Sequence, residues 1–423
     1  LAIGLLEEAF RAVIARQSSL RTAFHLLDEQ PVQRILDPAD ISFSIKRKEA
    51  DEAAGHADTK GQEDGGPLGT LSGLIADFIR PFDLSRPPLM RVEVVRLGDL
   101  KHLWLFDIHH IVSDATGYAV LYRELFGLYR GEELPPLRID YKDFSLWQNR
   151  LFETGTLDRQ REYWLQLFSG EVPRLNLPTD YPRPKVSRFE GEMHMFRLSR
   201  EDSVKFLEVG GAAGVTLFMN LLAAMNVLLF KYTGSRDIVI GSTHVGRPNA
   251  DLRDIVGMFV NLLAMRNRLR PGTRYIDFLQ EVKGSTLKAF ENQDMQFEML
   301  VEELNIKVDS TRNPLFDICI NVQNYEQLRV ELEDLTFSPA GYKYQNSKFD
   351  MLLWANQADE EIRFMLEYST ELFKIETIRQ FAGHFLEVIG QVGRNKEIKL
   401  QDIDISLDVV NPETQAPDMD FDF

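Results

Sequence analysis

Apolar side chains recur at helical spacing near the start of the chain and again beyond its first quarter. Residues 5–24 show this spacing and then run into an extended stretch, which predicts a helix followed by a strand. Residues 118–131 repeat the spacing up to a closing glycine, which predicts a second helix. Between them, residues 89–97 and 102–110 are both strand-like and flank a short Gly-Asp turn, which is typical of a β-hairpin. A short loop must therefore join the end of a strand to the start of a helix.

A proline-rich stretch precedes the second half of the chain. Residues 172–184 contain four prolines, which disfavour a regular element and predict a crossing between two lobes. The longest apolar stretch, residues 215–230, is shorter than the roughly 20 residues that a membrane span needs and includes two asparagines, so we interpret it as a buried helix. Helices are also expected at 143–152 and 161–168, and a strand at 237–245.

The length of the chain and these breaks predict its organisation. At 423 residues the chain is longer than one core normally organises. We expect an N-terminal lobe at 1–171, an inter-lobe crossing at 172–190, a C-terminal lobe at 191–407 and an acidic, linker-like tail at 408–423. The segment 49–66 is rich in Gly, Asp and Glu, which is typical of a solvated loop.

Charge and cysteine content narrow the range of partners. The chain has 48 Lys and Arg against 65 Asp and Glu, a net charge of −17, which opposes binding to nucleic-acid phosphates and to anionic membrane surfaces. Its single cysteine, Cys319, cannot form an internal disulfide, and no targeting leader opens the printed sequence. We therefore expect a cytoplasmic protein that binds neither nucleic acid nor membrane.

The candidate chemistry lies where the strand at 102–110 ends. His109 and His110 are adjacent, so on a strand their side chains point to opposite faces, and only one of them is expected to line a given cavity. Asp114 follows in the loop before the helix, where it could cap the helix, pair with a cation or face the cavity. No H-E-x-x-H or Cys/His cluster completes a metal site, and no G-x-S-x-G elbow supplies a hydrolase nucleophile. These residues alone leave a catalytic and a purely structural interpretation open.

Six motifs, in one order along the chain, resemble those of a single family. The stretch "IHHIVSDATG" at 108–117 resembles the H-H-x-x-x-D-G signature of the condensation domains of nonribosomal peptide synthetases. Five further stretches are similar to motifs of that family: "RQSSLRTAF" (16–24), "YKDFSLWQ" (141–148), "VGMFVNLLAMR" (256–266), "NQDMQFEMLVEEL" (292–304) and "DSTRNPLFD" (309–317). One such match would be weak evidence, whereas six in order make the resemblance specific.

The resemblance implies a fold and an activity. The family has an α/β fold of two chloramphenicol-acetyltransferase-like lobes with mixed sheets, arranged as a V-shaped pseudo-dimer around an active-site tunnel. Its members form an amide bond by transferring a donor acyl or peptidyl thioester onto the α-amine of an acceptor aminoacyl thioester. The phosphopantetheine arms that hold both groups belong to upstream donor and downstream acceptor carrier domains, so the domain itself is expected to bind no cofactor and no metal. An adjacent adenylation domain is a further expected partner.

The resemblance also implies roles for individual residues. Within the signature, His110 is expected to accept a hydrogen bond from the attacking amine, with stabilisation of the tetrahedral intermediate or orientation of the amine as the alternative. His109 and Asp114 are expected to support it structurally, Asp114 through a pair with Arg21, to which Arg16 contributes. The residues expected to line the substrate tunnel are Ala115, Gly117, Asn261, Asn313 and Ser347.

Departures from the family pattern keep alternatives open. Ala115 stands where the family usually has Gly, and Gln17 and Ser18 stand where it usually has His-Glu. The methyl group of Ala115 could narrow the tunnel or be accommodated by a shifted loop, so a catalytically silent docking or recruitment domain stays an alternative. Others are a carrier-domain epimerase, a dual epimerisation/condensation domain and a free-standing acyltransferase that uses coenzyme A. The "FVN" at 259–261 favours condensation over epimerisation.

Overall fold

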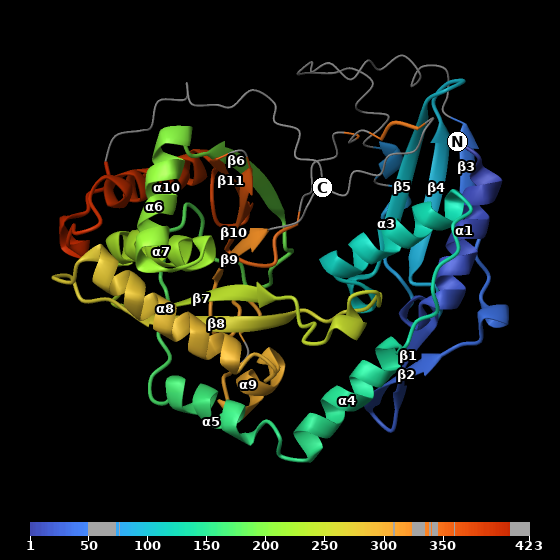
Figure 1. The fold of residues 1–423 in the computed structure, drawn as a ribbon, viewed down its shortest axis with the longest axis horizontal. Helices are drawn as coiled ribbons and strands as arrows, with labels where there is room; N and C mark the ends of the chain where they lie inside the picture. The colour runs from blue at the N-terminus through green and yellow to red at the C-terminus, as the bar shows by residue number, and fades with distance from the viewer. Residues whose placement is uncertain are drawn as a thin grey trace.

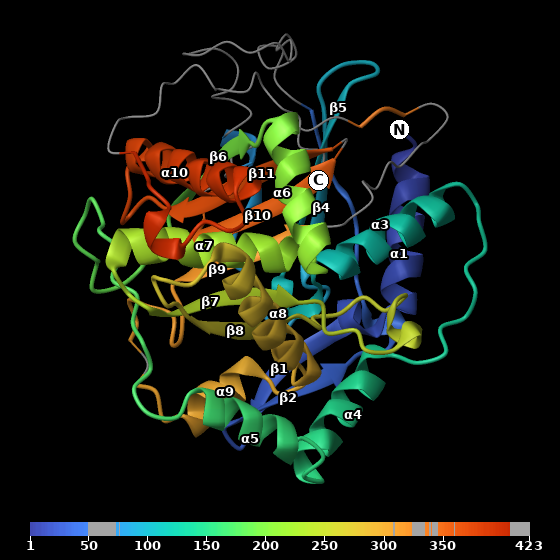
Figure 2. The same cartoon turned by 60° about the vertical axis from the view of Figure 1, so that its left-hand side comes forward.

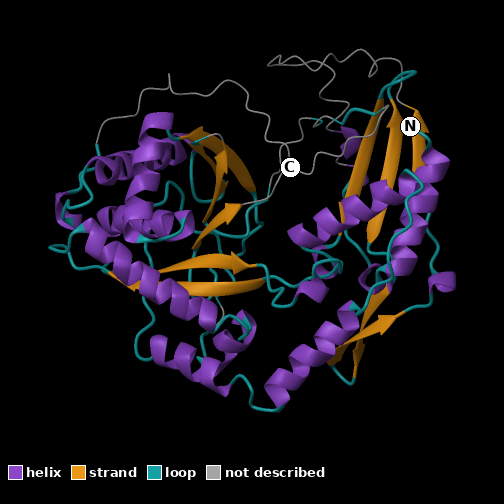
Figure 3. Ribbon diagram, in the orientation of Figure 1, coloured by secondary structure: helices purple, strands orange, loops and turns teal. Residues whose placement is uncertain are grey.

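The structure is a computed structural model in which two lobes stand side by side (Figure 1). The residues that it describes are 1–49, 73–75, 77–307, 309–323, 335–337, 340, 346–358 and 360–406. The tail expected at 408–423 and nearly all of the loop expected at 49–66 lie outside these residues. Each lobe combines strands with helices, as the colouring of Figure 3 shows, so the fold is mixed α/β.

The N-terminal lobe is built on a three-stranded sheet. The order of the strands is β3 (Lys46–Glu49), β4 (Met90–Arg96) and β5 (His102–Ile108). The antiparallel pair of β4 and β5 is the hairpin predicted from the sequence. The helices of this lobe are α1 (Ile3–Arg16) and α3 (Ala115–Tyr129), which contact each other. A second hairpin and three short 3-10 helices complete the lobe: β1 (Thr22–Leu27), β2 (Gln30–Ile35), η1 (Ser18–Arg21), η2 (Pro38–Asp40) and η3 (His110–Val112).

Both faces of this sheet are buried, which explains its continuous apolar runs. Val92 and Val94 of β4 belong to the core beneath α1 and α3, whereas Leu103 and Leu105 of β5 belong to a separate cluster together with Val95. Alternating side chains of a strand point to opposite faces, so a sheet covered on both sides needs apolar residues at successive positions.

The C-terminal lobe is built on a six-stranded sheet. The order of its strands is β6 (Gly191–Arg197), β11 (Glu361–Ser369), β10 (Met351–Ala358), β9 (Ile318–Gln323), β7 (Asp237–His244) and β8 (Asn261–Arg268). Its helices are α6 (Arg200–Ala213), α7 (Leu217–Thr233), α8 (Tyr275–Glu291), α9 (Phe297–Glu303), α10 (Ile375–Arg394), η4 (Ala250–Leu252) and η5 (Leu400–Asp402). Figure 2 shows α6, α7 and α10 over one face of the sheet. Helix α7 is buried along most of its length, as its apolar sequence predicts.

Two helices connect the lobes along their base. Helix α4 (Tyr141–Glu153) lies beneath the N-terminal lobe and α5 (Asp158–Leu167) beneath the other (Figure 1). Trp164 and the following Phe168 are part of the C-terminal hydrophobic core, so that core recruits residues from before the expected boundary at 171. The crossing at 172–190 contains no helix or strand, in agreement with its prolines.

The loop between β7 and β8, residues 245–260, extends from the C-terminal lobe to α3 (Figure 1) and is called the inter-lobe loop below. Its Val256 is completely buried in the N-terminal core. Ile255 and Phe259 pack against Phe144 of α4. The two lobes therefore share a hydrophobic junction, and the strand end that carries the histidines lies next to it.

A methyl group at Gly257 should weaken this junction. An alanine Cβ there would lie 2.2 Å from the ring of Tyr141, whose hydroxyl also donates to the Met258 carbonyl at 2.6 Å. We expect Gly257→Ala to lower the free energy of unfolding by about 1–3 kcal/mol, the usual cost of overpacking, measured by denaturant titration. Gly272→Ala is the matched control, because its Cβ would meet no atom within 4 Å. Equal stabilities of the two variants would contradict the prediction.

Candidate active site

The candidate site begins at the turn that follows β5. The His109 amide donates to the Leu89 carbonyl at 2.9 Å and so continues the pairing of β5 with the residue before β4. The Nδ1 atom of His109 accepts a hydrogen bond from the Ile111 amide at 3.1 Å, and the chain then forms η3. His109 is thus the cap of the turn that contains His110.

The two histidines differ in their surroundings. His109 is half-buried and its ring meets the ring of Phe82 edge-on, whereas His110 is exposed. Among the residues that the structure describes, none forms a hydrogen bond with the imidazole of His110. Burial lowers the pKa of His109; the neighbouring His110 and Lys348 lower it further, partly opposed by Asp107. Both histidines lie beyond Ile108, where β5 ends, so the turn and not strand alternation gives them different surroundings.

Asp114 is completely buried and caps α3. Its Oδ1 atom accepts from the Gly117 amide at 2.7 Å, which explains why α3 begins at Ala115 rather than at residue 118. Its Oδ2 atom accepts from the Phe259 amide at 3.0 Å, and its own amide donates to the Gly257 carbonyl at 3.1 Å. One residue thus joins the turn at residues 109–112, called the histidine turn below, to α3 and to the inter-lobe loop.

The cation that pairs with Asp114 is Arg247 and not Arg21. The Arg247 Nη2 atom lies 3.0 Å from Asp114 Oδ1, and the arginine side chain is only 4% exposed. The guanidinium also lies 3.9 Å from the centroid of the Phe259 ring and donates to the Leu252 and Ile255 carbonyls. The prediction of an Asp114–Arg21 pair is therefore wrong.

Arg21 and Arg16 have other partners. Arg21 donates to the Leu36 carbonyl at 2.5 Å and thus fastens the end of β2 to η1. Arg16 forms an ion pair with Glu124 of α3 at 2.9 Å. Arg16 therefore holds α3, the helix that Asp114 caps, and supports the site only through that helix. Arg21 contacts the end of β2 and does not contact Asp114.

Gln17, a departure from the family pattern, is a bridge between the lobes. Its amide nitrogen donates to Glu124 and to the Asp254 carbonyl, both at 2.9 Å, and its oxygen accepts from the Val256 amide at 2.9 Å. The side chain is completely buried. An amide both donates and accepts, so one residue satisfies groups of α3 and of the inter-lobe loop together.

Of the first three residues predicted to line the tunnel, one is exposed and the other two have structural roles. Ala115 is exposed at the first position of α3. Gly117 is buried, and a Cβ there would lie 2.7 Å from the Ser113 hydroxyl, so its small size serves packing. Asn261 is buried, donates to the Gln293 and Met295 carbonyls and accepts from the Leu262 and Phe297 amides. Its amide has no capacity left for a substrate.

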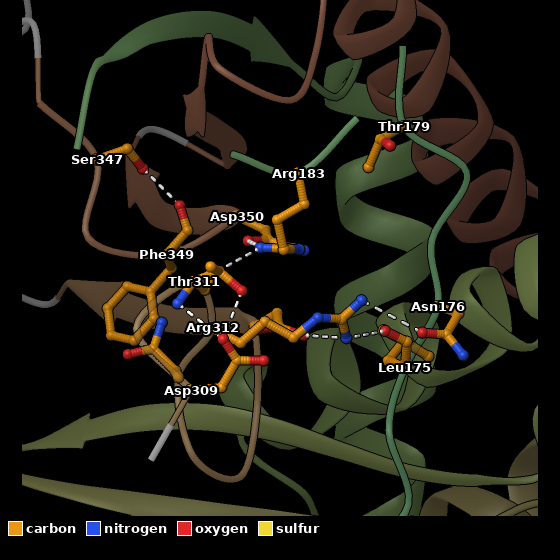
Figure 4. Close-up of polar contacts among 12 residues, drawn as sticks. Leu175, Asn176, Thr179, Arg183, Asp309, Thr311, Arg312, Ser347, Phe349 and Asp350 are labelled. Atoms are coloured by element: carbon orange, nitrogen blue, oxygen red, sulfur yellow. Dashed lines mark hydrogen bonds and ion pairs between the residues drawn. The ribbon is translucent and has the colours of Figure 1, made fainter. Parts of the chain in front are cut away.

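Asn313 and Ser347 line an open pocket in the C-terminal lobe. Asn313 donates to the Lys348 carbonyl at 3.1 Å. The Ser347 hydroxyl donates to the Phe349 carbonyl at 2.8 Å (Figure 4). Both residues thus fix the loop that carries Lys348, whose charge acts on His109. A substrate contact by Asn313 or Ser347 stays a prediction.

Charged residues surround this pocket. Arg183, from the crossing segment, forms a two-pronged pair with Asp350 and donates to the Thr311 carbonyl at 2.9 Å (Figure 4). Burial, reinforced by Asp350, raises the pKa of Asp317 to about 6, although Arg312 lies 3.1 Å from it. The crossing segment is therefore fastened to the C-terminal lobe by the Arg183–Asp350 pair, together with a single antiparallel bridge between Glu190 and Asn346.

Comparison with known proteins decides the family. The family model described as Condensation domain matches residues 1–413. This chain belongs to the condensation-domain family. The domain is 42% identical to bacitracin synthase 3 of Bacillus licheniformis over 94% of its own length, and 42% identical to gramicidin S synthase 2 of Brevibacillus brevis over 95%. It spans only 6% and 9% of those two proteins.

Solved structures confirm the two-lobed fold that the resemblance implied. The X-domain in a complex with OxyB from teicoplanin biosynthesis is similar with a TM-score of 0.85 and 24% identity, covering 96% of this condensation domain and 89% of that chain. The first condensation domain of the CDA synthetase gives 0.73 and 19%, covering 96% and 91%. At these identities the likeness concerns the fold alone.

The described part of this condensation domain has neither a cluster of metal ligands nor a single helix suited to crossing a membrane. No group of three or more His, Cys, Asp and Glu residues there is placed to hold a metal ion. No single described helix is long and apolar enough to cross a membrane; α6 and α7 reach that length and apolarity only as a pair bent by 106°.

Loss of either member of the Asp114–Arg247 pair should be strongly destabilising. The remaining buried charge would have no counter-charge, which typically costs about 3–5 kcal/mol. We expect Asp114→Ala and Arg247→Ala each to lower the free energy of unfolding by that amount in denaturant titrations. Arg21→Ala serves as the comparison and should lose only about 0.5–1.5 kcal/mol for its carbonyl hydrogen bond. An equal loss in Arg21→Ala and Arg247→Ala would refute the assignment.

Proposed function

We propose that this domain forms an amide bond by transferring a carrier-bound acyl or peptidyl thioester to the α-amine of a carrier-bound aminoacyl thioester. The observation that carries the proposal is the exposed His110, with an imidazole free of hydrogen bonds to described residues, on a turn held by His109 and Asp114. The 42% identity to two antibiotic synthases supports it further. In this proposal the reacting groups arrive on the phosphopantetheine arms of separate carrier domains, next to an adenylation domain, and this domain binds no cofactor itself.

Deprotonation of the attacking amine requires little help from the protein. An α-amine has a pKa near 7.7–8.0, so roughly a tenth to a fifth is already the free base at neutral pH. A positioned general base typically contributes about 10²–10⁴-fold, whereas holding two reactants in attack geometry can supply roughly 7–11 kcal/mol. Positioning of the two tethered substrates is therefore the larger contribution.

His110 acts within that geometry. The amine nitrogen attacks the thioester carbonyl carbon, and the C–N bond forms as a tetrahedral intermediate. The imidazole accepts a hydrogen bond from the amine and takes its proton as the intermediate forms. When the C–S bond breaks, the imidazolium passes that proton to the leaving thiolate, which becomes the free thiol of the donor arm, and the imidazole is neutral again. His109, whose Nδ1 atom is already engaged with the Ile111 amide, keeps the turn in place.

Mass spectrometry of loaded carriers tests the proposal against its alternatives. Donor and acceptor carriers are loaded, incubated with the domain and weighed intact. Condensation adds the donor acyl mass to the acceptor and removes it from the donor. Epimerisation leaves both masses unchanged but inverts a stereocentre, which chiral analysis of the released residue detects. A silent docking domain changes neither mass nor stereochemistry.

Replacement of His110 should abolish most turnover. We expect His110→Ala to lower the rate of product formation at least about a hundredfold, the typical contribution of a positioned acid–base group. Its melting temperature should match that of the wild type, because the ring has no described hydrogen-bond partner. His25→Ala, an exposed histidine of the same lobe, is the control and should retain full turnover. Unchanged turnover in His110→Ala would exclude the assigned role.

The alanine at position 115 should be compatible with activity. Ala115 has a helical backbone and an exposed side chain, so its methyl group fits the loop as it stands. We expect Ala115→Gly to lose about 0.5–1 kcal/mol of stability with little change in turnover. Ala119→Gly on the same helix controls for the loss of helix propensity. A tenfold gain in turnover from a nearly silent wild type would instead identify a docking domain.

A further inference from the structure

A chain of contacts leads from β4 to the cap of the histidine turn. Arg91 and Asp107 are paired across β4 and β5, and Arg91 Nε lies 3.1 Å from Asp107 Oδ2. Because strand register places the two residues opposite each other, their ion pair is part of the hairpin. The arginine side chain is 13% exposed, so its guanidinium is held in a largely buried position.

Arg91 in turn holds the segment that precedes β4. Its guanidinium donates to the Phe78 carbonyl at 3.5 Å and to the Arg80 carbonyl. Its Cζ atom lies 3.7 Å from the centroid of the Phe82 ring. A guanidinium above an aromatic face is attracted by the ring quadrupole, and the attraction grows with desolvation. The position of Phe82 is therefore set by Arg91 as well as by apolar packing.

Phe82 covers the imidazole of His109. The two ring centroids are 6.0 Å apart at an interplanar angle of 89°, an edge-on contact. The Nδ1 atom of His109 accepts the Ile111 amide hydrogen, so it carries no proton of its own. An imidazolium has hydrogen on both nitrogens and could not accept this bond. The cap of the turn therefore requires a neutral His109.

We propose that Phe82, held by Arg91, is a positioning residue whose ring shelters His109 and so preserves the Ile111 hydrogen bond on which the presentation of His110 depends. The charged and titratable groups near His109 come from several elements: Asp107 and His110 on its own segment, Arg91 on β4, Arg80 in the preceding segment and Lys348 in the loop before β10. Burial is the largest influence on its pKa, which is lowered, and this agrees with a shelter.

The first test is titration of His109 by NMR of the imidazole groups, with His109→Gln used to assign the signal. In Phe82→Ala water reaches the ring, so its pKa should rise from the lowered value toward the ordinary 6.5 or so. Phe82→Leu keeps an apolar cover and should keep the lowered pKa. Leu84→Ala, an apolar truncation in the same segment, should leave it unchanged. An unchanged pKa of His109 in Phe82→Ala would overturn the proposal.

The second test rests on the proposed condensation activity and uses the ratio of variant to wild-type turnover, in which titration of the amine substrate cancels. An imidazole with a pKa of about 6.5 is roughly three-quarters protonated at pH 6.0. The ratio for Phe82→Ala should therefore be lower at pH 6.0 than at pH 8.0, by up to about fourfold, whereas the ratio for Phe82→Leu should depend on pH much less. A ratio for Phe82→Ala that is equal at both pH values would overturn the coupling to His110.

The His109 titration and the turnover ratio distinguish failure of the Phe82 shelter from failure of the proposed condensation activity. If the wild type forms no product, the proposed function fails, but the His109 titration still tests the shelter. If Phe82→Ala does not fold, Phe82→Gln replaces it, because its polar side chain of similar length also brings water to the ring. A pKa of His109 in Phe82→Gln equal to that in Phe82→Leu would then count against the shelter.

Discussion

A single buried carboxylate holds the functional region together. Asp114 is completely buried, and removal of a charge from water is compensated only by close, well-directed partners. Those partners come from two elements: the Gly117 amide in α3, and the Phe259 amide and the Arg247 guanidinium in the inter-lobe loop. The carboxylate cannot change its position without losing at least one of them. The histidine turn, the helix and the junction of the lobes are therefore one mechanical unit.

Small residues make that unit possible. The inter-lobe loop approaches so closely that a Cβ at Gly246 would lie 1.8 Å from the Phe259 carbonyl, and Gly246 also has a φ of +67°, which favours glycine. Gly257 similarly leaves room for Tyr141. This close approach buries backbone amides of the inter-lobe loop. Gln17 and Asp114 accept hydrogen bonds from two of them, the amides of Val256 and Phe259. Close packing and polar compensation are thus required together at this junction.

Local patterns predicted most of the elements, whereas the partners across the junction could not be found from them. The β4–β5 hairpin, α3 and the buried α7 follow from hydrophobic spacing, which depends on neighbours in sequence. Arg247 is 133 residues from Asp114, and no spacing rule distinguishes it from Arg21. The role of Trp164 in the C-terminal core was missed for the same reason, since burial of an aromatic residue does not reveal which core it joins. Motif order identified the family but not this pairing.

The two adjacent histidines have two different roles, capping a turn and handling a proton, that one residue could not combine. A residue that caps a turn must keep a fixed protonation state, because its Nδ1 atom accepts a backbone hydrogen bond. A residue that handles the proton of an amine must be free to change that state. His109 meets the ring of Phe82 edge-on and has a lowered pKa, which suits the first demand, while the exposed His110 suits the second. One short segment directly after β5 thus presents a fixed imidazole and an exposed imidazole at once.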